Sequence, residues 1–337
     1  MIIRSRAPVR ITFAGGGTDI SPYDKDFGGL CIGATIDKYV YSSLIPRSDQ
    51  GIEIHSWDLR SKQTFKSLEE MVYDGNGDLI KAVIKKMNPY FGFNLFVRSD
   101  VNPHSGLGAS ASAAASIIGC FNHLRKEDKL NRYQIAELAY LIEKEEIKNI
   151  GGRQDQYAAV FGGINSYEFN GEQFVRVNKL DISEDSILEL QKNLLLVYAG
   201  KREQSSGQIH LGESHSREDP DKLARLHDVK KVAEEMQFIL REGKLSEFGR
   251  LVKESWEKKV EYNPHTTNRR INYLIDTALD NGAIGARLMG AGGGGHLLVY
   301  CKSNTEQIVS QELEKSGAKV IPFSFDFTGL KTWEVAE

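Results

Sequence analysis

The pattern of hydrophobic and polar positions in the first third of the chain is typical of several separate β-strands. Four segments rich in β-branched and aromatic residues, each bounded by turn residues, are predicted strands: 1–15, 31–46, 51–57 and 93–101. The spacing then becomes helical, which predicts helices over 109–124 and 132–148. Gly151 and Gly152 interrupt this pattern, and the apolar segment 157–169 is predicted to lead back into a strand.

The second half of the chain begins with a predicted strand over the apolar segment 194–200. Apolar residues at helical spacing then predict three amphipathic helices, over 221–241, 246–260 and 269–283. The last of these ends at Asn281-Gly282, a favourable C-terminal cap. A glycine-rich loop follows and leads into a buried strand within 286–301. This order of elements predicts an α+β fold with two lobes.

Length and composition are those of an ordinary globular protein. The 337 residues favour two packed domains, and we place their boundary within 165–190, as domains 1–172 and 173–337. A net charge of -3 gives no electrostatic reason to expect a nucleic-acid partner. No run of about 18 apolar residues predicts a membrane span. Three widely spaced cysteines form no disulfide framework, so we expect a cytoplasmic protein.

Three glycine-rich loops stand out at 13–19, 104–112 and 290–296. One such loop alone commonly marks a turn or close backbone packing. The middle loop, "HSGLGASAS", lacks the lysine of the Walker phosphate loop. It matches the dinucleotide variant G-x-G-x-x-A, but the acidic pair Glu127-Asp128 lies between two predicted helices, so the required strand is missing.

A phosphate-binding loop remains as an interpretation of the middle loop. Its glycines would let backbone N–H groups approach an anion, and the predicted helix from Ala109 directs its positive dipole end there. The hydroxyls of Ser105, Ser110 and Ser112 could bind phosphate or Mg²⁺. A metal at this position needs a carboxylate, for which Glu143 is a candidate, although its acidic run "EKEE" could equally be a solvated helix face.

Asp155 lies in "GGRQDQYAAVFGG", between two pairs of glycines. It could form an Asx-turn or cap a helix. It could equally be a general base beside a phosphoryl acceptor. The local sequence leaves both interpretations open.

Taken together, "APVRITFAGGGTD" (7–19), "NPHSGLGASASAA" (102–114), "RLMGAGGGG" (287–295) and Asp155 resemble, in order and spacing, the GHMP small-molecule kinases. The resemblance covers essentially the whole chain. It implies a ribosomal-protein-S5-like N-terminal lobe, a ferredoxin-like C-terminal lobe, and transfer of phosphate from ATP to an alcohol with Mg²⁺.

The resemblance also implies roles for individual residues. Asp155 is the catalytic aspartate and Arg10 the residue that steadies developing charge, while Ser110 and Glu143 hold the metal. The implied ATP-binding residues are Gly106, Leu107, Gly108, Ala109, Ser110, Ala111 and Ser112. The implied substrate-binding residues are Gly16, Gly17, Thr18, Asp19, Gly152, Arg153, Arg202, Gly292 and Gly293. Ala109 replaces the first serine of the family's usual pair, and His296 is given no role.

Within the family, the chain looks most like the D-glycero-D-manno-heptose 7-phosphate kinases, which phosphorylate the anomeric hydroxyl of a sugar phosphate for nucleotide-activated heptose synthesis. The likeness lies in "RAPVRITFAGGGTDISPYDKDFGG" (6–29), "GGRQDQYAAVFGG" (151–163) and "RLMGAGGGG" (287–295). That likeness implies an anionic acceptor and a cationic clamp, for which Arg153, Lys201 and Arg202 are candidates. A kinase for fucose, galactose or an amino sugar is the alternative, as is a non-catalytic, sugar-sensing member of the fold. The expected partners are ATP and a small sugar phosphate, without nucleic acid or membrane, and a homodimer is left open.

Overall fold

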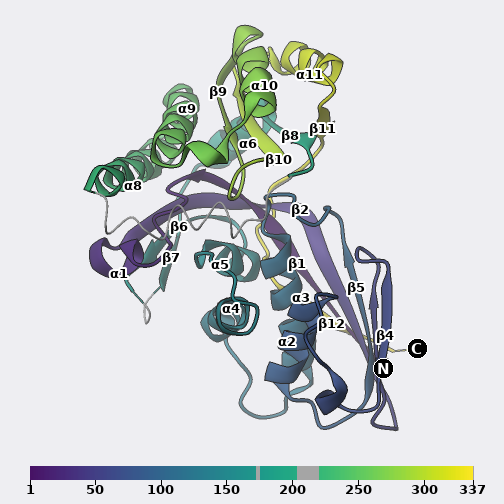
Figure 1. Ribbon diagram of the computed structural model, residues 1–337. Coiled ribbons are helices and arrows are strands. Elements are labelled where there is room, and N and C mark those ends of the chain that lie inside the picture. Colours follow the sequence, from purple (N-terminus) through teal and green to yellow (C-terminus); the bar gives the residue numbers. More distant parts are fainter. Residues whose placement is uncertain (172–174, 203–219, 337) are drawn as a thin grey trace.

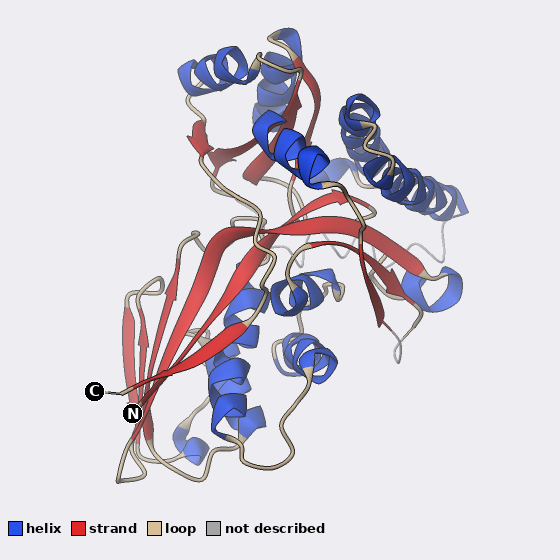
Figure 2. Ribbon diagram, turned by 180° about the vertical axis from the view of Figure 1, so that it is seen from behind, coloured by secondary structure: helices blue, strands red, loops and turns tan. Residues whose placement is uncertain are grey.

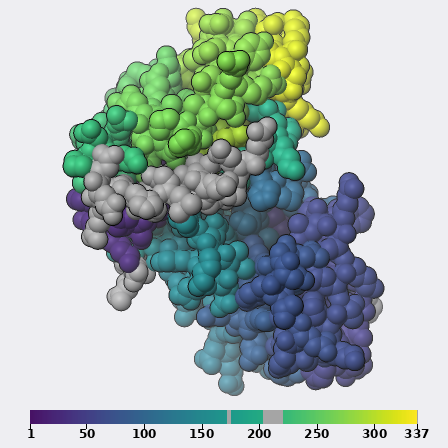
Figure 3. All heavy atoms as spheres, viewed as in Figure 1, coloured from purple at the N-terminus to yellow at the C-terminus, as the bar shows by residue number. Residues whose placement is uncertain are grey.

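The computed structural model describes residues 1–171, 175–202 and 220–336. The chain forms two lobes that pack against each other (Figure 1; Figure 3). In Figure 3 the N-terminal lobe is purple to teal, and the C-terminal lobe is green to yellow. Within the described ranges, no helix is both long and apolar enough to cross a membrane. The two-lobed α+β architecture predicted from the sequence is confirmed.

The N-terminal lobe is built on one curved sheet in the order β12-β1-β2-β5-β3-β4, with β6 pairing β2 and β7 pairing β6. Its strands are β1 (Ile2–Ala14), β2 (Gly29–Pro46), β3 (Ile52–Ser56), β4 (Ser61–Phe65), β5 (Phe93–Ser99), β6 (Ile164–Phe169), β7 (Val175–Lys179) and β12 (Lys331–Val335). The long strand β2 pairs with β5 through its second half and with β6 through its first half. Pairing is antiparallel except between β3 and β5.

Helices cover one face of this sheet (Figure 1; Figure 2). They are α2 (Asp78–Met87), α3 (Ala109–Leu124), α4 (Arg132–Leu141) and α5 (Gln154–Phe161), with α1 (Tyr23–Phe27) at the far end. Helix α3 packs closely because its buried face consists mainly of small residues, including Ala111, Ala114 and Ala115. Its start at Ala109 places a helix N-terminus next to the second glycine loop, as predicted.

The C-terminal lobe has a four-stranded antiparallel sheet in the order β11-β8-β10-β9. Its strands are β8 (Leu194–Gly200), β9 (Ala283–Leu288), β10 (Gly295–Cys301) and β11 (Lys319–Ile321). Its helices are α6 (Glu184–Asn193), α8 (Pro220–Arg241), α9 (Leu245–Tyr262), α10 (Arg269–Asp280) and α11 (Glu306–Lys315). The strand order 4-1-3-2 along the chain is that of a ferredoxin-like sheet.

One hydrophobic core runs across the junction of the lobes. It joins Phe13 and Ile11 of β1 to Phe248 of α9 and Met236 of α8. The rings of Phe13 and Phe248 meet edge-on at 5.2 Å between centroids. The shared core therefore fixes the position of the C-terminal lobe above the first glycine loop.

Two predicted elements are wrong in detail. The predicted helix over 132–148 is α-helical only to Leu141 and continues as a π-helical turn, Ile142–Glu146. The segment 157–169 does lead into a strand, β6, as predicted, but its first part, 157–161, belongs to helix α5. Its five apolar residues are too short a run to distinguish helix from strand by periodicity. The division after residue 172 stays a prediction, and both β7 and β12, which follow it, pair within the larger sheet.

Candidate active site

A cavity of about 610 Å³ lies between the lobes and is lined by residues of all three glycine-rich loops. Gly16 and Gly17 come from the first loop, Gly106 and Gly108 from the second, and Gly290 from the third. Its apolar lining residues include Val40, Leu79, Ile80, Val97, Val101, Pro103 and Ala113. Charged side chains, among them Arg10, Asp19 and Asp155, also line it. The volume is in the range of small-molecule sites.

The second and third loops are in direct backbone contact. Gly106 has φ +80°, and a Cβ there would lie 2.7 Å from the carbonyl oxygen of Met289. The ring of His296, to which the sequence assigned no role, makes a 2.8 Å hydrogen bond through Nδ1 with the carbonyl oxygen of Ser105. His296 is buried, so this bond ties strand β10 to the start of the second glycine-rich loop.

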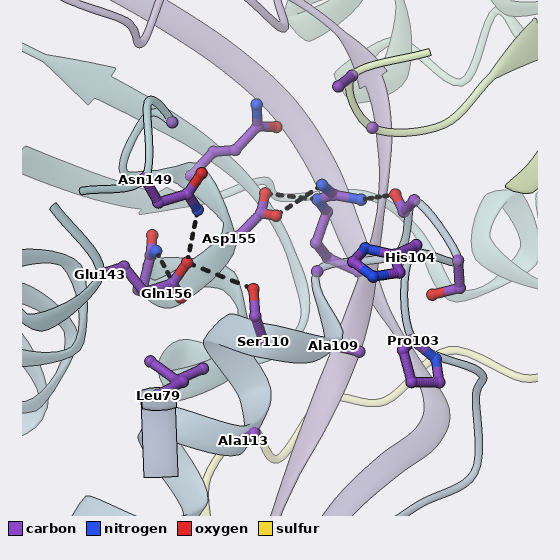
Figure 4. A pocket seen from close by; sticks show the side chains of 18 of the residues that line it. Leu79, Pro103, His104, Ala109, Ser110, Ala113, Glu143, Asn149, Asp155 and Gln156 are labelled. Carbon is purple, nitrogen blue, oxygen red and sulfur yellow. Dashed lines mark hydrogen bonds and ion pairs between the residues drawn. The ribbon is translucent and has the colours of Figure 1, made fainter. Parts of the chain in front are cut away.

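Ser110 and Glu143 lie together, as the sequence predicted (Figure 4). The Ser110 hydroxyl donates to Glu143 Oε2 at 3.3 Å, and Asn149 and Gln156 donate to the same carboxylate at 3.0 and 3.3 Å. The π-helical turn buries Glu143 to 5% exposure, whereas Glu145 of the same acidic run is exposed. Burial raises the Glu143 pKa to about 7, and the charge of Asp155 adds to this rise. The solvated-face interpretation is therefore wrong for Glu143.

Arg10 and Asp155 form a two-pronged ion pair (Figure 4). Arg10 Nε and Nη2 donate to the two carboxylate oxygens of Asp155, each at 2.7 Å. Arg10 Nη1 donates to the carbonyl oxygen of Gly106 at 2.5 Å. The aspartate therefore lies in the first turn of α5 beside the second glycine-rich loop, and neither an Asx-turn nor a side-chain cap is formed.

Asp19 lies on the other side of the first turn of α5. Its carboxylate accepts from the backbone N–H of Gly17 at 3.2 Å and from both the backbone and the side chain of Gln154 at 3.3 Å. Burial raises the pKa of Asp19, as does the negative charge of Asp155. Gln154, Asp155 and Gln156 thus point to three different partners: Asp19, Arg10 and Glu143.

Several predicted residues line the cavity and others do not. Among the implied ATP-binding residues, Gly106, Gly108, Ala109 and Ser110 line it. Leu107, Ala111 and Ser112 are buried behind the loop, and Ser112 donates to the carbonyl oxygen of Pro8 at 2.8 Å. Gly16, Gly17, Asp19 and Gly152 also line the cavity.

Three more predicted substrate-binding residues make structural contacts instead. Thr18 is fully buried, and its hydroxyl donates to the carbonyl oxygens of Gly15 and Leu30. Gly292 and Gly293 pack against the backbone of Thr266, and the N–H of Gly293 donates to its carbonyl oxygen at 2.8 Å. These contacts shape the loops behind the cavity surface.

Arg153, which was predicted to belong to a cationic clamp, is not among the residues that line the cavity. Its guanidinium is 2% exposed and is held by Glu137 and Asp24 at 3.2 Å, above the ring of Tyr140. Arg153 is the residue before α5, so its side chain leaves the helix in a different direction from that of Asp155. Arg202 does line the cavity and is buried, which lowers its pKa, whereas Lys201 is exposed.

The sequence did not single out two cationic residues of the C-terminal lobe. Arg287 of β9 and Lys259 of α9 both line the cavity and are buried. Lys259 donates to the carbonyl oxygen of Gly290 at 2.6 Å. Arg287 is the first residue of the motif "RLMGAGGGG", three residues before the third glycine loop, and this position was the available signal.

The three glycine-rich loops, the Arg10–Asp155 ion pair and the two-lobed fold are together those of a small-molecule kinase. The models for the N-terminal and C-terminal domains of the GHMP kinases match residues 78–163 and 231–319. The chain belongs to the GHMP kinases and is a phosphotransferase.

Three relatives show how close the similarity within this family is. The chain is 32% identical to a D-glycero-alpha-D-manno-heptose 7-phosphate kinase of Campylobacter jejuni, over 99% of both chains. The structure of a D-glycero-D-manno-heptose 1-phosphate kinase from Bacteroides thetaiotaomicron superimposes with a TM-score of 0.83, at 28% identity, over 99% of this chain and 100% of the other. A putative sugar kinase from Campylobacter jejuni superimposes with a TM-score of 0.79, at 30% identity, over 99% of this chain and 98% of the other.

Proposed function

We propose that the protein transfers the γ-phosphoryl group of ATP to the anomeric C1 hydroxyl of D-glycero-D-manno-heptose 7-phosphate, which gives the 1,7-bisphosphate. The observation that carries this proposal is the position of the Arg10–Asp155 pair. Arg10 contacts the phosphate-binding loop at Gly106, and Asp155 adjoins Gln154, which holds Asp19 of the first loop. Similarity to a heptose 7-phosphate kinase supports the choice of acceptor.

ATP would bind with its base beside apolar lining residues such as Leu79 and Ala113 and its phosphates at the second loop. Leu79 and Ala113 lie on the side of Ser110 that is away from Asp155, as expected for a nucleoside pocket (Figure 4). Backbone N–H groups at Gly106–Ala109 and the N-terminus of α3 would then face the phosphates. The positive φ of Gly108 and the close approach of Asp155 to it disfavour a side chain at that position.

Ser110 and Glu143 fit a Mg²⁺ ion that arrives with nucleotide. Mg²⁺ in such sites commonly takes one or two protein oxygens and completes its shell with phosphate and water. A hydroxyl and a carboxylate 3.3 Å apart supply this set, so the lack of three-residue metal clusters among the described residues is compatible with it. When bound, Mg²⁺ would neutralise charge on the phosphates.

The acceptor hydroxyl would bind between Asp155 and the first loop. Its oxygen forms the new bond to the γ-phosphorus while the bond from that phosphorus to the oxygen of ADP breaks, and Asp155 orients the hydroxyl and accepts its proton. Arg10, which is held against both Asp155 and Gly106, would stabilise charge on the transferring group.

The test is an ADP-release assay with a panel of acceptors. Heptose 7-phosphate is compared with unphosphorylated heptose, fucose, galactose and an amino sugar, and the position of the new phosphate is determined by ³¹P NMR. We expect the highest kcat/KM with heptose 7-phosphate. A neutral sugar that reacts faster would replace the proposed acceptor, and ATP binding without turnover on any acceptor would favour a sensing protein. A homodimer and a cytoplasmic location stay predictions.

A further inference from the structure

Arg287 differs from three other buried cations in its partners. Arg10 is paired with Asp155, Arg153 with Glu137 and Asp24, and Lys81 with Asp74. Arg287 is 2% exposed, and within residues 1–171, 175–202 and 220–336 no carboxylate pairs with it. Buried charges are normally paired or bind an oppositely charged ligand.

The guanidinium of Arg287 is anchored on one side only. Its Nη1 donates to the carbonyl oxygen of Phe13 at 2.5 Å and to the hydroxyl of Ser255 at 2.8 Å. Its Nε is buried and has no hydrogen-bond partner among the described residues. The two contacts hold the planar group in a fixed orientation and leave donors unused.

The free edge of Arg287 faces the acceptor end of the cavity. Its Nη2 lies 4.0 Å from the point that a Cβ of Gly16 would occupy, and the side-chain amide of Gln154 lies 3.7 Å from the same point. Arg287 lines the cavity together with Gly16, Asp19 and Asp155. A side chain at Gly16 would therefore be in ordinary contact with a fixed cation and an amide, next to the proposed acceptor site.

An anion with several oxygens fits this arrangement best. A guanidinium presents parallel N–H donors that match phosphate oxygens. Burial lowers the Arg287 pKa to about 10, which leaves the group charged at neutral pH. Because the cation is already desolvated and oriented, a ligand would not have to order it on binding.

We propose that Arg287 binds a phosphate group of the substrates at the acceptor end of the cavity. The inference rests on the proposed kinase function. Two substrate groups have the required chemistry: the phosphate of the acceptor sugar and the phosphoryl group in transfer from ATP. Arg202 also lines the cavity, but its electrostatic effect on His104 places it beside the second loop.

The test compares Arg287→Met and Arg287→Lys with Arg250→Met, which removes an arginine from the exposed face of α9. Calorimetry measures the binding of four probes: heptose 7-phosphate, heptose, ADP and the non-hydrolysable ATP analogue AMP-PNP. Losing hydrogen bonds to a charged group is expected to weaken binding by about 10- to 150-fold. Arg287→Lys should recover part of this loss, and Arg250→Met should match the wild type.

Selective weakening separates the two sources of phosphate. Loss of heptose 7-phosphate affinity with heptose unchanged assigns Arg287 to the acceptor phosphate. Loss of AMP-PNP affinity with ADP unchanged assigns it to the transferring group. Equal or no weakening of all four probes would overturn the inference and leave Arg287 as a structural link between Phe13 and Ser255. Wild-type protein that binds heptose 7-phosphate through Arg287 without phosphorylating it would refute the proposed function alone.

Discussion

Replacing Asp155 with asparagine tests the assigned roles of the Arg10–Asp155 pair. Asparagine keeps the size of the side chain, and its oxygen can still accept one bond from Arg10. The change removes the negative charge and the second of two 2.7 Å hydrogen bonds. Arg10 is 6% exposed and would be left without a carboxylate partner among the described residues.

The geometry sets the size of both expected effects. A hydrogen bond to a charged group contributes about 1.5–3 kcal/mol to stability. Asp155 is partly exposed to water, so we expect its replacement to lower the free energy of unfolding by about 2 kcal/mol, in the lower part of this range. With an unfolding entropy of about 2.1 cal/mol/K per residue, that loss lowers the Tm of the 337-residue chain by about 3 °C. Loss of a positioned base lowers kcat by about 10²- to 10⁴-fold.

The assay pairs ADP release with calorimetric ATP binding, which we expect to be retained. Asp49→Asn is the matched control, because Arg47 and Asp49 form the same two-pronged pair at 2.7 Å on the surface, away from the cavity. It should leave kcat unchanged. A kcat for Asp155→Asn within about tenfold of the wild type would remove the catalytic assignment, since that lies below the range for general-base catalysis.

Three further predictions concern Gly108 of the second glycine-rich loop and the carboxylate of Glu143. Glu143→Gln should raise the Mg²⁺ concentration for half-maximal velocity at least about tenfold, and an unchanged Mg²⁺ titration would contradict the metal role. Gly108→Ala should cost about 1–3 kcal/mol of strain, because φ is +78° and the new Cβ would lie 3.0 Å from Asp155. Calorimetry should show weaker ATP binding by this variant. The control Gly75→Ala, at φ +87° and with open space around the new Cβ, should bind ATP normally. Without Mg²⁺, the pKa of Glu143 is about 7 in the native state and 4.5 in the unfolded state, so the native state binds more protons between these pH values. About 3 kcal/mol of stability, fully present below pH 4.5, is therefore lost as the pH rises through 7. Urea denaturation at pH 5 and 8 should show this difference, and its persistence in Glu143→Gln would exclude Glu143 as the cause.

Long periodic segments could be predicted from the sequence because their signal is local. Helix α3 has the predicted bounds, and α8, α9 and α10 differ from prediction by at most three residues at either end. Strand β12 had no comparable signal, since its partner β1 lies about three hundred residues away in the chain. Helix α5 was missed because a short buried apolar run has the same composition in a helix as in a strand.

The backbone of the site was predictable, whereas the partners of its side chains were not. Glycine patterns identify loops, because positive φ values and close backbone contact restrict the residue type. Nothing comparable indicates where an arginine points. Arg153 is two residues from Asp155 in the sequence but is held by Glu137 and Asp24, while Arg287, distant in the sequence, faces the cavity.

Some charged side chains around the cavity are paired with an opposite charge and others are not. This arrangement suits the binding of a metal ion together with phosphate groups. Glu143 is held by neutral amides and a hydroxyl, so none of these partners competes with a metal ion as a cation. Arg287 is held by a carbonyl and a hydroxyl, so its charge stays available to an anion. Arg10 and Asp155 neutralise each other between these two positions. Mg²⁺·ATP would therefore meet complementary charge at Glu143, and a phosphorylated sugar would meet it at Arg287. The phosphoryl group would be transferred beside the fixed and almost neutral Arg10–Asp155 pair, which limits the reorganisation needed during the reaction.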